Sequence, residues 1–195
     1  FITGKNGQRI SNPNNANLFS LNPNYDADSE AMWSGYYSVI SRCNGAIQYT
    51  TIGQDPIFDN VAGHAYFLRA YSYFQLVRLW GDIPLWTELP SSTNLHKAKS
   101  SAKDIYSQII SDANEAANLM NNTLGEGYPM MFAANMLLAK VYMTLATNSS
   151  LHDGSKSESE YWQMAYDDAI TVKYSGNYSL HRNYQDLVTL SGENS

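Results

Sequence analysis

The sequence contains little cysteine, and this limits the kinds of site that it can build. Cys43 is the one cysteine among 195 residues, so a disulfide within the chain and a metal site of several thiolates are both excluded. Cys43 falls on the apolar side of a helical pattern, which predicts a small buried side chain. The four histidines are scattered, and none forms the paired spacing that zinc and di-iron sites use. We therefore expect neither a metal nor a cofactor.

Charge is scarce as well, and positive charge most of all. Charged residues make up 15% of the chain, well below the usual quarter, and the net charge is −6. Nucleic-acid binding needs a basic patch that faces the phosphates, and the sequence contains none. Polar character comes instead from Asn, Ser, Gln, Thr and Tyr, a composition that favours a protein outside the cytoplasm.

Signatures of common enzymes are also missing. The sequence has no glycine-rich phosphate loop and no Gly-x-Ser-x-Gly elbow, and Cys43 lies within a helix rather than at an activating helix start. A pair of carboxylates for glycoside hydrolysis stays open, but the candidates stand in loops or on solvent faces, where the dehydrated setting of a catalytic acid is not expected. These candidates are Glu88, Asp104, Glu115 and Asp153.

The stretch GHAYFLRAYSYFQLVRLWGDIPLW, residues 63–86, is apolar but too often interrupted to cross a membrane, because His64, Arg69 and Arg78 break the run. A helix that is apolar on nearly every side is buried among other helices. Gly81 caps this helix, and the proline that follows shortly afterwards prevents it from continuing. We therefore predict that this is the central helix of a helical domain.

Two arginines fall within this apolar helix, Arg69 and Arg78. A buried guanidinium needs a carboxylate or carbonyl partner, so we expect both arginines to have structural roles rather than to bind a ligand. The candidate partners are Asp55, Asp82 and Asp112.

Apolar residues at intervals of three and four predict four more helices. With the central helix, the predicted ranges are about 28–47, 56–80, 101–120, 129–146 and 161–173. Ser101 is predicted to cap the third helix, and Pro129 to occupy the first turn of the fourth. Helices with one polar face alternate with nearly all-apolar helices, an order typical of antiparallel pairs that stack into a tetratricopeptide-type repeat. We therefore predict an all-α fold with irregular loops.

We expect these helices to form a single domain over residues 1–195. Asn, Gly, Pro and Ser predict a loop-rich lead-in over 1–27, followed by helical repeats over 28–175 and a non-helical tail over 176–195. A Pro/Ser/Thr-rich link is predicted over 87–99. The chain starts without Met and has no signal peptide, and we expect that sequence is missing at both ends.

Five short strings, in order and with plausible spacing, resemble the SusD/RagB family of outer-membrane nutrient-binding lipoproteins. The most recognisable is FLRAYSYFQLV at 67–77, closed by Gly-Asp-Ile-Pro-Leu at 81–85. The others are WSGYYSVISRCN at 33–44, IYSQIISDANEAANL at 105–119, AANMLLAKVY at 133–142, and SGNYSL with NYQDL within 175–187. The resemblance covers roughly residues 30 to 190.

The chain departs from the family pattern in two places. His64 stands where the family usually has an acid, so a pairing of that acid with an arginine such as Arg69 is in question here. The lipid-bearing cysteine at the N-terminus of family members is absent from this chain. Because family members run to several hundred residues, the resemblance implies that this chain is an N-terminal portion.

The resemblance implies a right-handed, tetratricopeptide-like helical repeat that belongs to a cell-surface glycan-binding or nutrient-binding protein, and not to an enzyme. Such a protein is lipid-anchored in the outer membrane of a Gram-negative bacterium. It covers a TonB-dependent, SusC-like transporter and hands it the nutrient, and the helical repeat resembles the part of the family that faces the transporter.

Four residues are the candidate ligand contacts. Asn24, Tyr25 and Asp26 combine a ring, an amide and a carboxylate, which supply the apolar stacking and directional hydrogen bonds that a sugar needs. Trp86 follows the stop of the central helix, where it either stacks on a sugar or, as we prefer, packs against the next helix. Oxygen ligands at alternate positions from Asn24 to Glu30 resemble a calcium loop, but we favour acids at a helix start as their explanation.

Two other functions stay open. A tetratricopeptide-type scaffold would bind a peptide in a concave groove and have no role with sugars. A fragment of a helical glycosidase would need two facing carboxylates beside a deep cleft.

Overall fold

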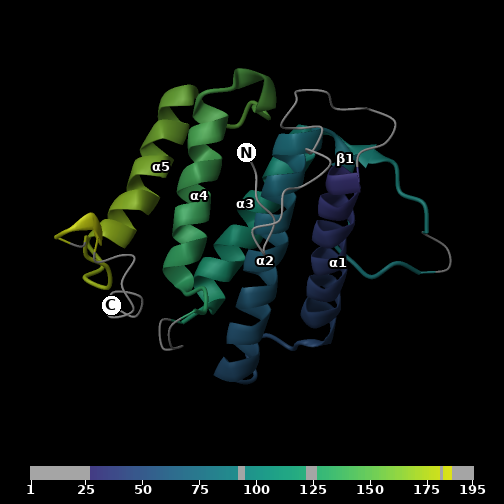
Figure 1. Cartoon of the computed structure of the whole chain (residues 1–195), viewed down its shortest axis with the longest axis horizontal. Helices are drawn as coiled ribbons and strands as arrows, with labels where there is room; N and C mark the ends of the chain where they lie inside the picture. Colours follow the sequence, from purple (N-terminus) through teal and green to yellow (C-terminus); the bar gives the residue numbers. More distant parts are fainter. Residues whose placement is uncertain (1–26, 92–94, 122–126, 181, 186–195) are drawn as a thin grey trace, which may run out of the picture.

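The computed structural model describes residues 27–91, 95–121, 127–180 and 182–185. The candidate contacts Asn24, Tyr25 and Asp26, with the rest of the lead-in over 1–26, lie outside these described residues. The helices of the described part are α1 (Ala27–Tyr49), α2 (Pro56–Trp80), α3 (Ala102–Leu119), α4 (Met131–Ala146) and α5 (Glu158–Lys173). Each packs mainly against the helices before and after it, so that α1 and α5 lie at opposite ends of the row (Figure 1). The prediction of an all-α fold of antiparallel helix pairs is confirmed.

The limits of α2 and α3 follow from capping chemistry that the sequence displays. The side chain of Asp55 accepts a hydrogen bond from the backbone N–H of Ile57 at 2.8 Å, and the proline at position 56 begins the helix without needing a donor. Gly81 ends α2 with φ of 68°, a left-handed conformation that glycine adopts without strain. Ser101 caps α3 by accepting from the N–H of Asp104 at 3.2 Å, as predicted.

Two predicted helix starts differ from the structure. The fifth helix begins at Glu158 rather than near 161, because Ser157 and Glu160 form a capping box in which each side chain binds the other residue's backbone N–H. The fourth begins at Met131, so Pro129 precedes the helix instead of occupying its first turn. Met130, at the cap position, makes no side-chain cap hydrogen bond.

The predicted link between the second and third helices contains a feature that the sequence did not indicate. Strand β1 (Ile83–Pro84) pairs antiparallel with β2 (Lys99–Ser100), and Ile83 faces Ser100. The side chain of Asp82 also accepts a hydrogen bond from the N–H of Ala102 at 2.8 Å. These contacts bring the two ends of the link together. A short 3₁₀ turn, Ser149–Leu151, lies between α4 and α5.

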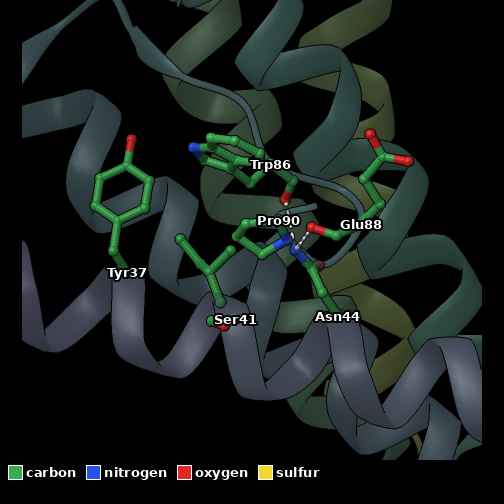
Figure 2. A pocket seen from close by; sticks show the side chains of 7 residues that line it. Tyr37, Ser41, Asn44, Trp86, Glu88 and Pro90 are labelled. Atoms are coloured by element: carbon green, nitrogen blue, oxygen red, sulfur yellow. Dashed lines mark hydrogen bonds between the residues drawn. The ribbon is translucent and has the colours of Figure 1, made fainter. Parts of the chain in front are cut away.

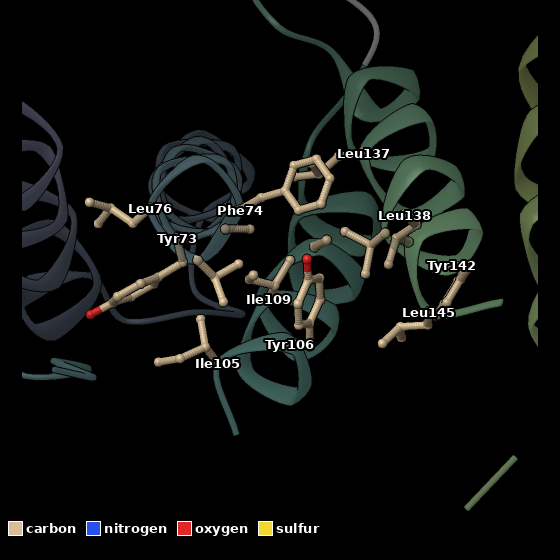
Figure 3. Packing of buried hydrophobic residues seen from close by; sticks show 14 of the residues in the cluster. Tyr73, Phe74, Leu76, Ile105, Tyr106, Ile109, Leu137, Leu138, Tyr142 and Leu145 are labelled. Carbon is tan, nitrogen blue, oxygen red and sulfur yellow. The ribbon is translucent and has the colours of Figure 1, made fainter. Parts of the chain in front are cut away.

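The core forms where α2, α3 and α4 meet (Figure 3). Tyr73 and Leu76 from α2 are fully buried beside Ile105 and Ile109 from α3, while Leu138 from α4 is 2% exposed. Side chains of this kind each contribute about 1.5–3 kcal/mol when they are removed from water. The two nearly all-apolar helices, α2 and α4, thus each lie between two other helices, whereas α1 and α5 lie at the ends of the row.

Cys43 is buried on α1, as predicted. Burial, opposed by the charge of Arg69, raises the pKa of its thiol to about 11. The thiol therefore stays protonated at neutral pH and behaves as a small apolar side chain.

The prediction that α2 is buried on nearly every side is only partly correct. One stripe along the helix stays exposed and contains the apolar residues Ile57, Val61, Leu68, Tyr71 and Leu79. Arg78 is also exposed, and its guanidinium lies 4.8 Å from the ring centroid of Phe74 rather than in a buried ion pair. The sequence pattern shows how apolar a helix is, but the packing of the neighbouring helices determines which of its faces are buried. No helix of the described residues is long and apolar enough to span a membrane.

Candidate functional site

Beyond strand β1, the backbone of the segment that follows α2 is bonded to side chains of α1 and α2. We name residues 84–90 the Trp86 loop. The hydroxyl of Tyr37 on α1 donates to the carbonyl oxygen of Pro84 at 2.8 Å, which fixes the start of the loop. Because buried backbone groups need partners, the side chains that supply them determine the course of the loop.

Tyr73 on α2 binds Trp86 twice through one oxygen. Its hydroxyl donates to the carbonyl oxygen of Trp86 at 2.9 Å and accepts from the N–H of the same residue at 2.7 Å. The Tyr73 side chain is fully buried, and this burial raises the pKa of its phenol. The phenol therefore stays protonated and keeps its donor at neutral pH.

Asn44 on α1 binds the loop from the other side. Its Nδ2 donates to the carbonyl oxygens of Trp86 at 3.1 Å and Glu88 at 3.0 Å (Figure 2). Its Oδ1 accepts a hydrogen bond from Nη1 of Arg69 at 2.8 Å, and the same nitrogen donates to the carbonyl oxygen of Thr87 at 3.1 Å. The Asn44 side chain thus uses both its amide hydrogens and its oxygen within the protein.

Arg69 also forms a buried, bidentate ion pair with Asp112 of α3. Nε donates to Oδ2 at 2.8 Å and Nη2 donates to Oδ1 at 2.7 Å, with side chains that are 4% and 1% exposed. Burial by itself lowers the pKa of Arg69, but hydrogen bonding to Asp112 and its charge raise it overall. Gln108 donates to Asp112 at 2.8 Å. The structural role predicted for Arg69 is therefore confirmed, with Asp112 as the partner among the three proposed aspartates.

A pocket of about 230 Å³ opens between α1 and the Trp86 loop. It is lined by Tyr37, Ile40, Ser41, Asn44, Trp86, Glu88 and Pro90. Figure 2 shows the Trp86 ring and the Tyr37 ring at this pocket, with Asn44 reaching up from α1 to the loop backbone. Lys97 places its Nζ 5.1 Å from the centroid of the Trp86 ring, which is within the range of a cation–π contact. The pocket therefore combines aromatic surface with hydroxyl, amide and carboxylate groups.

Among the predicted contacts, Trp86 alone falls within the described residues. Its side chain is half-buried, packs against the main core cluster and also lines the pocket. The sequence reasoning missed Tyr37, Ser41 and Asn44. Their spacing of four and three along α1 places them on one helical face, which is a usable signal. What it could not show is that the loop after α2 returns to this face.

Metal chemistry finds no support in this part of the chain. Among the described residues, no group of three or more His, Cys, Asp or Glu side chains is arranged to hold a metal ion.

Comparison with known proteins identifies the family. The sequence model of a SusD-like family, described as starch-binding and associating with the outer membrane, matches residues 3–143. SusD-like protein P38 of Formosa agariphila is 37% identical over 108 residues, which are 53% of this chain and 21% of that protein. A SusD-like protein of Bacteroides ovatus is 27% identical over 175 residues, which are 87% of this chain and 32% of that protein.

Solved structures show the same fold. A crystal structure with a xylogluco-oligosaccharide superposes with a TM-score of 0.78 at 24% identity, covering 92% of this chain and 36% of the other. A SusD superfamily protein from Parabacteroides distasonis gives a TM-score of 0.76 at 25% identity and covers 89% and 37%. A laminarin-binding SusD-like protein gives 0.68 at 24% identity and covers 80% and 34%.

The chain spans well under half the length of these relatives. The family match extends over most of the chain and includes α1, α2, α3 and the Trp86 loop, which carry the ion pair and the pocket. The chain therefore belongs to the SusD-like family.

Proposed function

We propose that the protein binds a glycan at the cell surface and is not an enzyme. The observation that carries this proposal is the pocket beside Trp86, on a loop held by buried side chains of α1 and α2. The family description names binding and association with the outer membrane. Two structural relatives support the class of ligand, since one was solved with a xylogluco-oligosaccharide and another binds laminarin.

The chemistry of the pocket suits a sugar. Aromatic rings stack on the apolar face of a pyranose, while hydroxyl, amide and carboxylate groups bond its rim. Trp86 and Tyr37 supply the rings, and Ser41 and Glu88 are exposed residues with polar side chains at the pocket wall. A volume of about 230 Å³ is smaller than the roughly 300–1,000 Å³ of sites that enclose a whole ligand. We propose that the pocket takes one unit of a longer chain.

The remaining candidate contacts and the partners are part of the same proposal. Asn24, Tyr25 and Asp26 precede α1 directly, and we propose that they add to the glycan site. We further propose that a lipid anchor outside this chain attaches the protein to the outer membrane. There it would deliver the glycan to a TonB-dependent, SusC-like transporter.

The test is affinity electrophoresis and calorimetry of the whole protein with xyloglucan oligosaccharides, laminarin and a wider glycan panel. We expect at least one glycan to bind, and we expect Trp86→Ala to weaken that binding by roughly ten-fold to a hundred-fold, since one lost stacking contact and its burial are worth ~1–3 kcal/mol. Trp162→Ala is the matched control, because Trp162 is exposed on α5, outside the pocket.

Three outcomes would contradict parts of the proposal. Absence of binding to every glycan would contradict the function. Unchanged binding in a correctly folded Trp86→Ala variant would contradict this site, and unchanged binding in Tyr25→Ala would remove the lead-in residues from it. Failure to co-purify with the cognate transporter would contradict the partner.

A tetratricopeptide-type scaffold is the second candidate function. The exposed apolar stripe of α2 favours it, because such a surface is the kind that binds another protein. Good peptide binding without any glycan binding and without association with the transporter would favour the scaffold over the first proposal.

A further inference from the structure

The conformation of Trp86 is set by a contact that involves only its backbone. The N–H and C=O of this residue both reach the single oxygen of Tyr73, at 2.7 and 2.9 Å. One atom can bind both groups only when they point to the same side of the chain, as they do in an extended residue that exchanges two bonds with a partner strand. Tyr73 therefore takes the place of a neighbouring strand for this one residue.

The side chains of Tyr73, Asn44 and Arg69 are buried and use most of their donors within the protein. The Tyr73 hydroxyl uses its donor and an acceptor site on Trp86, and Asn44 uses both amide hydrogens and its oxygen. Arg69 is occupied by Asp112, by Asn44 and by the carbonyl oxygen of Thr87. Tyr73 and Arg69 bind the loop without lining the pocket, whereas Asn44 and Trp86 both line it.

We infer that Tyr73 is a positioning residue for ligand binding, which holds the peptide of Trp86 so that its indole lies at the pocket before any ligand arrives. The inference rests on the proposed glycan-binding function and deepens it. A loop that is already ordered loses little conformational freedom on binding, so its fixed state increases affinity without any contact to the ligand.

The variant that isolates this contact is Tyr73→Phe, which removes the hydroxyl and keeps the ring. Two readouts are needed, and the first requires no ligand. Amide hydrogen exchange followed by NMR reports the N–H of Trp86 directly, and we expect exchange to accelerate by ten-fold or more when its acceptor is lost. The second is the affinity of the folded protein for xyloglucan oligosaccharides and laminarin, which we expect to fall by about three-fold to ten-fold, the effect of one or two lost hydrogen bonds.

Tyr106→Phe is the matched control. Tyr106 is a tyrosine of α3 that is 4% exposed, packs against Phe74, and lies outside the pocket lining. We expect this variant to change neither the exchange of the Trp86 N–H nor glycan affinity, even where it lowers the melting temperature. If Tyr73 had only a structural role, both variants would melt at lower temperatures, but their folded molecules would bind the glycan with equal affinity.

The outcomes separate the inference from the function beneath it. Unchanged exchange at Trp86 in Tyr73→Phe overturns the inference, and so does accelerated exchange with unchanged affinity. If the wild-type protein binds no glycan of the wider panel, the proposed function fails, and the positioning role in glycan binding fails with it. Accelerated exchange in that case would show that Tyr73 fixes the loop for another purpose.

If Tyr73→Phe does not fold, Tyr37→Phe is the second variant. It removes the bond to Pro84, two residues before Trp86, from a side chain that is only half-buried. We then expect a smaller acceleration of exchange at Trp86 together with a smaller loss of affinity. Unchanged exchange in this variant would contradict the view that side-chain bonds to the loop hold Trp86 in place.

Discussion

The two ends of the row of helices are stabilised by different kinds of interaction. At one end, α1, α2, α3 and the Trp86 loop share a buried polar network in which Arg69, Asp112 and Asn44 have partners for their side-chain groups. At the other end, α4 and α5 meet mainly through apolar and aromatic contacts, such as the stacked rings of Tyr142 and Tyr161 at 6.3 Å.

The polar contact at the second end is less complete. Asn135 on α4 donates to Asp168 on α5 at 3.0 Å, but its own Oδ1 is buried without a partner. A buried acceptor that lacks a donor costs stability. Apolar packing is non-directional and is enough to join two helices. The Trp86 loop is irregular and needs directional hydrogen bonds to hold the Trp86 ring at the pocket. The buried polar network of Arg69, Asp112 and Asn44 therefore lies beside the pocket.

The largest expected effect comes from breaking the network at the first end. Asp112→Ala leaves the Arg69 guanidinium buried and unpaired, so we expect the free energy of unfolding to fall by about 3–5 kcal/mol. Denaturant unfolding followed by circular dichroism measures this. Asp167→Ala, an exposed aspartate on α5, is the control and should change stability by no more than about 0.5 kcal/mol. Equal effects in the two variants would remove the contrast between the two ends.

The second effect tests how closely α2 approaches the end of α3. A Cβ at Gly63 would lie 2.7 Å from Cγ and 2.9 Å from the backbone nitrogen of Met120. We expect Gly63→Ala to cost about 1–3 kcal/mol, because backbone cannot move aside easily. Gly35→Ala on α1 meets no atom within 4 Å and should instead stabilise the helix by about 0.5–1 kcal/mol. Thermal melts of both variants check the opposite signs, and the same sign in both would refute this reasoning.

The third prediction concerns His64, which connects the two ends. Its Nδ1 lies 2.7 Å from the carbonyl oxygen of Asn60 and its Nε2 lies 2.8 Å from that of Pro129, just before α4. A ring nitrogen must carry a proton to donate to either carbonyl. His64→Glu brings a carboxylate, which has no donor, so we expect a loss of about 1 kcal/mol.

His64→Gln is the matched variant, because an amide retains a donor. We expect its melting temperature to lie between those of the wild type and His64→Glu. A glutamate variant as stable as the wild type would show that the contact to Pro129 does not fix the start of α4.

The smallest predicted effect is an increase in the free energy of unfolding, from a substitution at the contact between α4 and α5. Burial raises the pKa of Asp168, the hydrogen bond from Asn135 opposes this, and the charge of Asp167 adds to it. A carboxyl whose pKa is higher in the folded state stabilises the fold below its unfolded pKa, and this contribution is lost as the pH rises through the folded value. Asp168→Asn does not titrate, and its amide supplies a donor for the orphaned Oδ1 of Asn135.

We therefore expect Asp168→Asn to gain about 0.5–1 kcal/mol at neutral pH, an advantage that shrinks as the pH falls through the raised folded pKa of Asp168 towards the ordinary aspartate pKa. Unfolding curves over a pH series measure the difference between variant and wild type. Asp167→Asn, on the exposed side of α5, is the control for simple removal of charge. A gain that is the same at every pH would show that the titration of Asp168 is not its cause.

Local chemistry explains which parts of the fold could be predicted from the sequence. The start and end of α2 follow from Asp55, Pro56 and Gly81, and they agree with the prediction because each cap is made within a few residues. The pairing of β1 with β2 was missed, since two-residue strands carry no periodicity. Of the pocket, Trp86 was named, but Tyr37 and Asn44 were not, because they join it from a helix some 40 residues earlier.

The sequence by itself determined the helices, their alternation between polar and apolar faces, and the family, because each of these is written in spacings of a few residues. Only the tertiary structure decided that Asp112, rather than Asp55 or Asp82, pairs with Arg69, and that α1 provides the wall opposite Trp86. Partners distant in sequence meet through the packing of whole helices, and a buried group accepts whichever partner that packing brings within bonding distance.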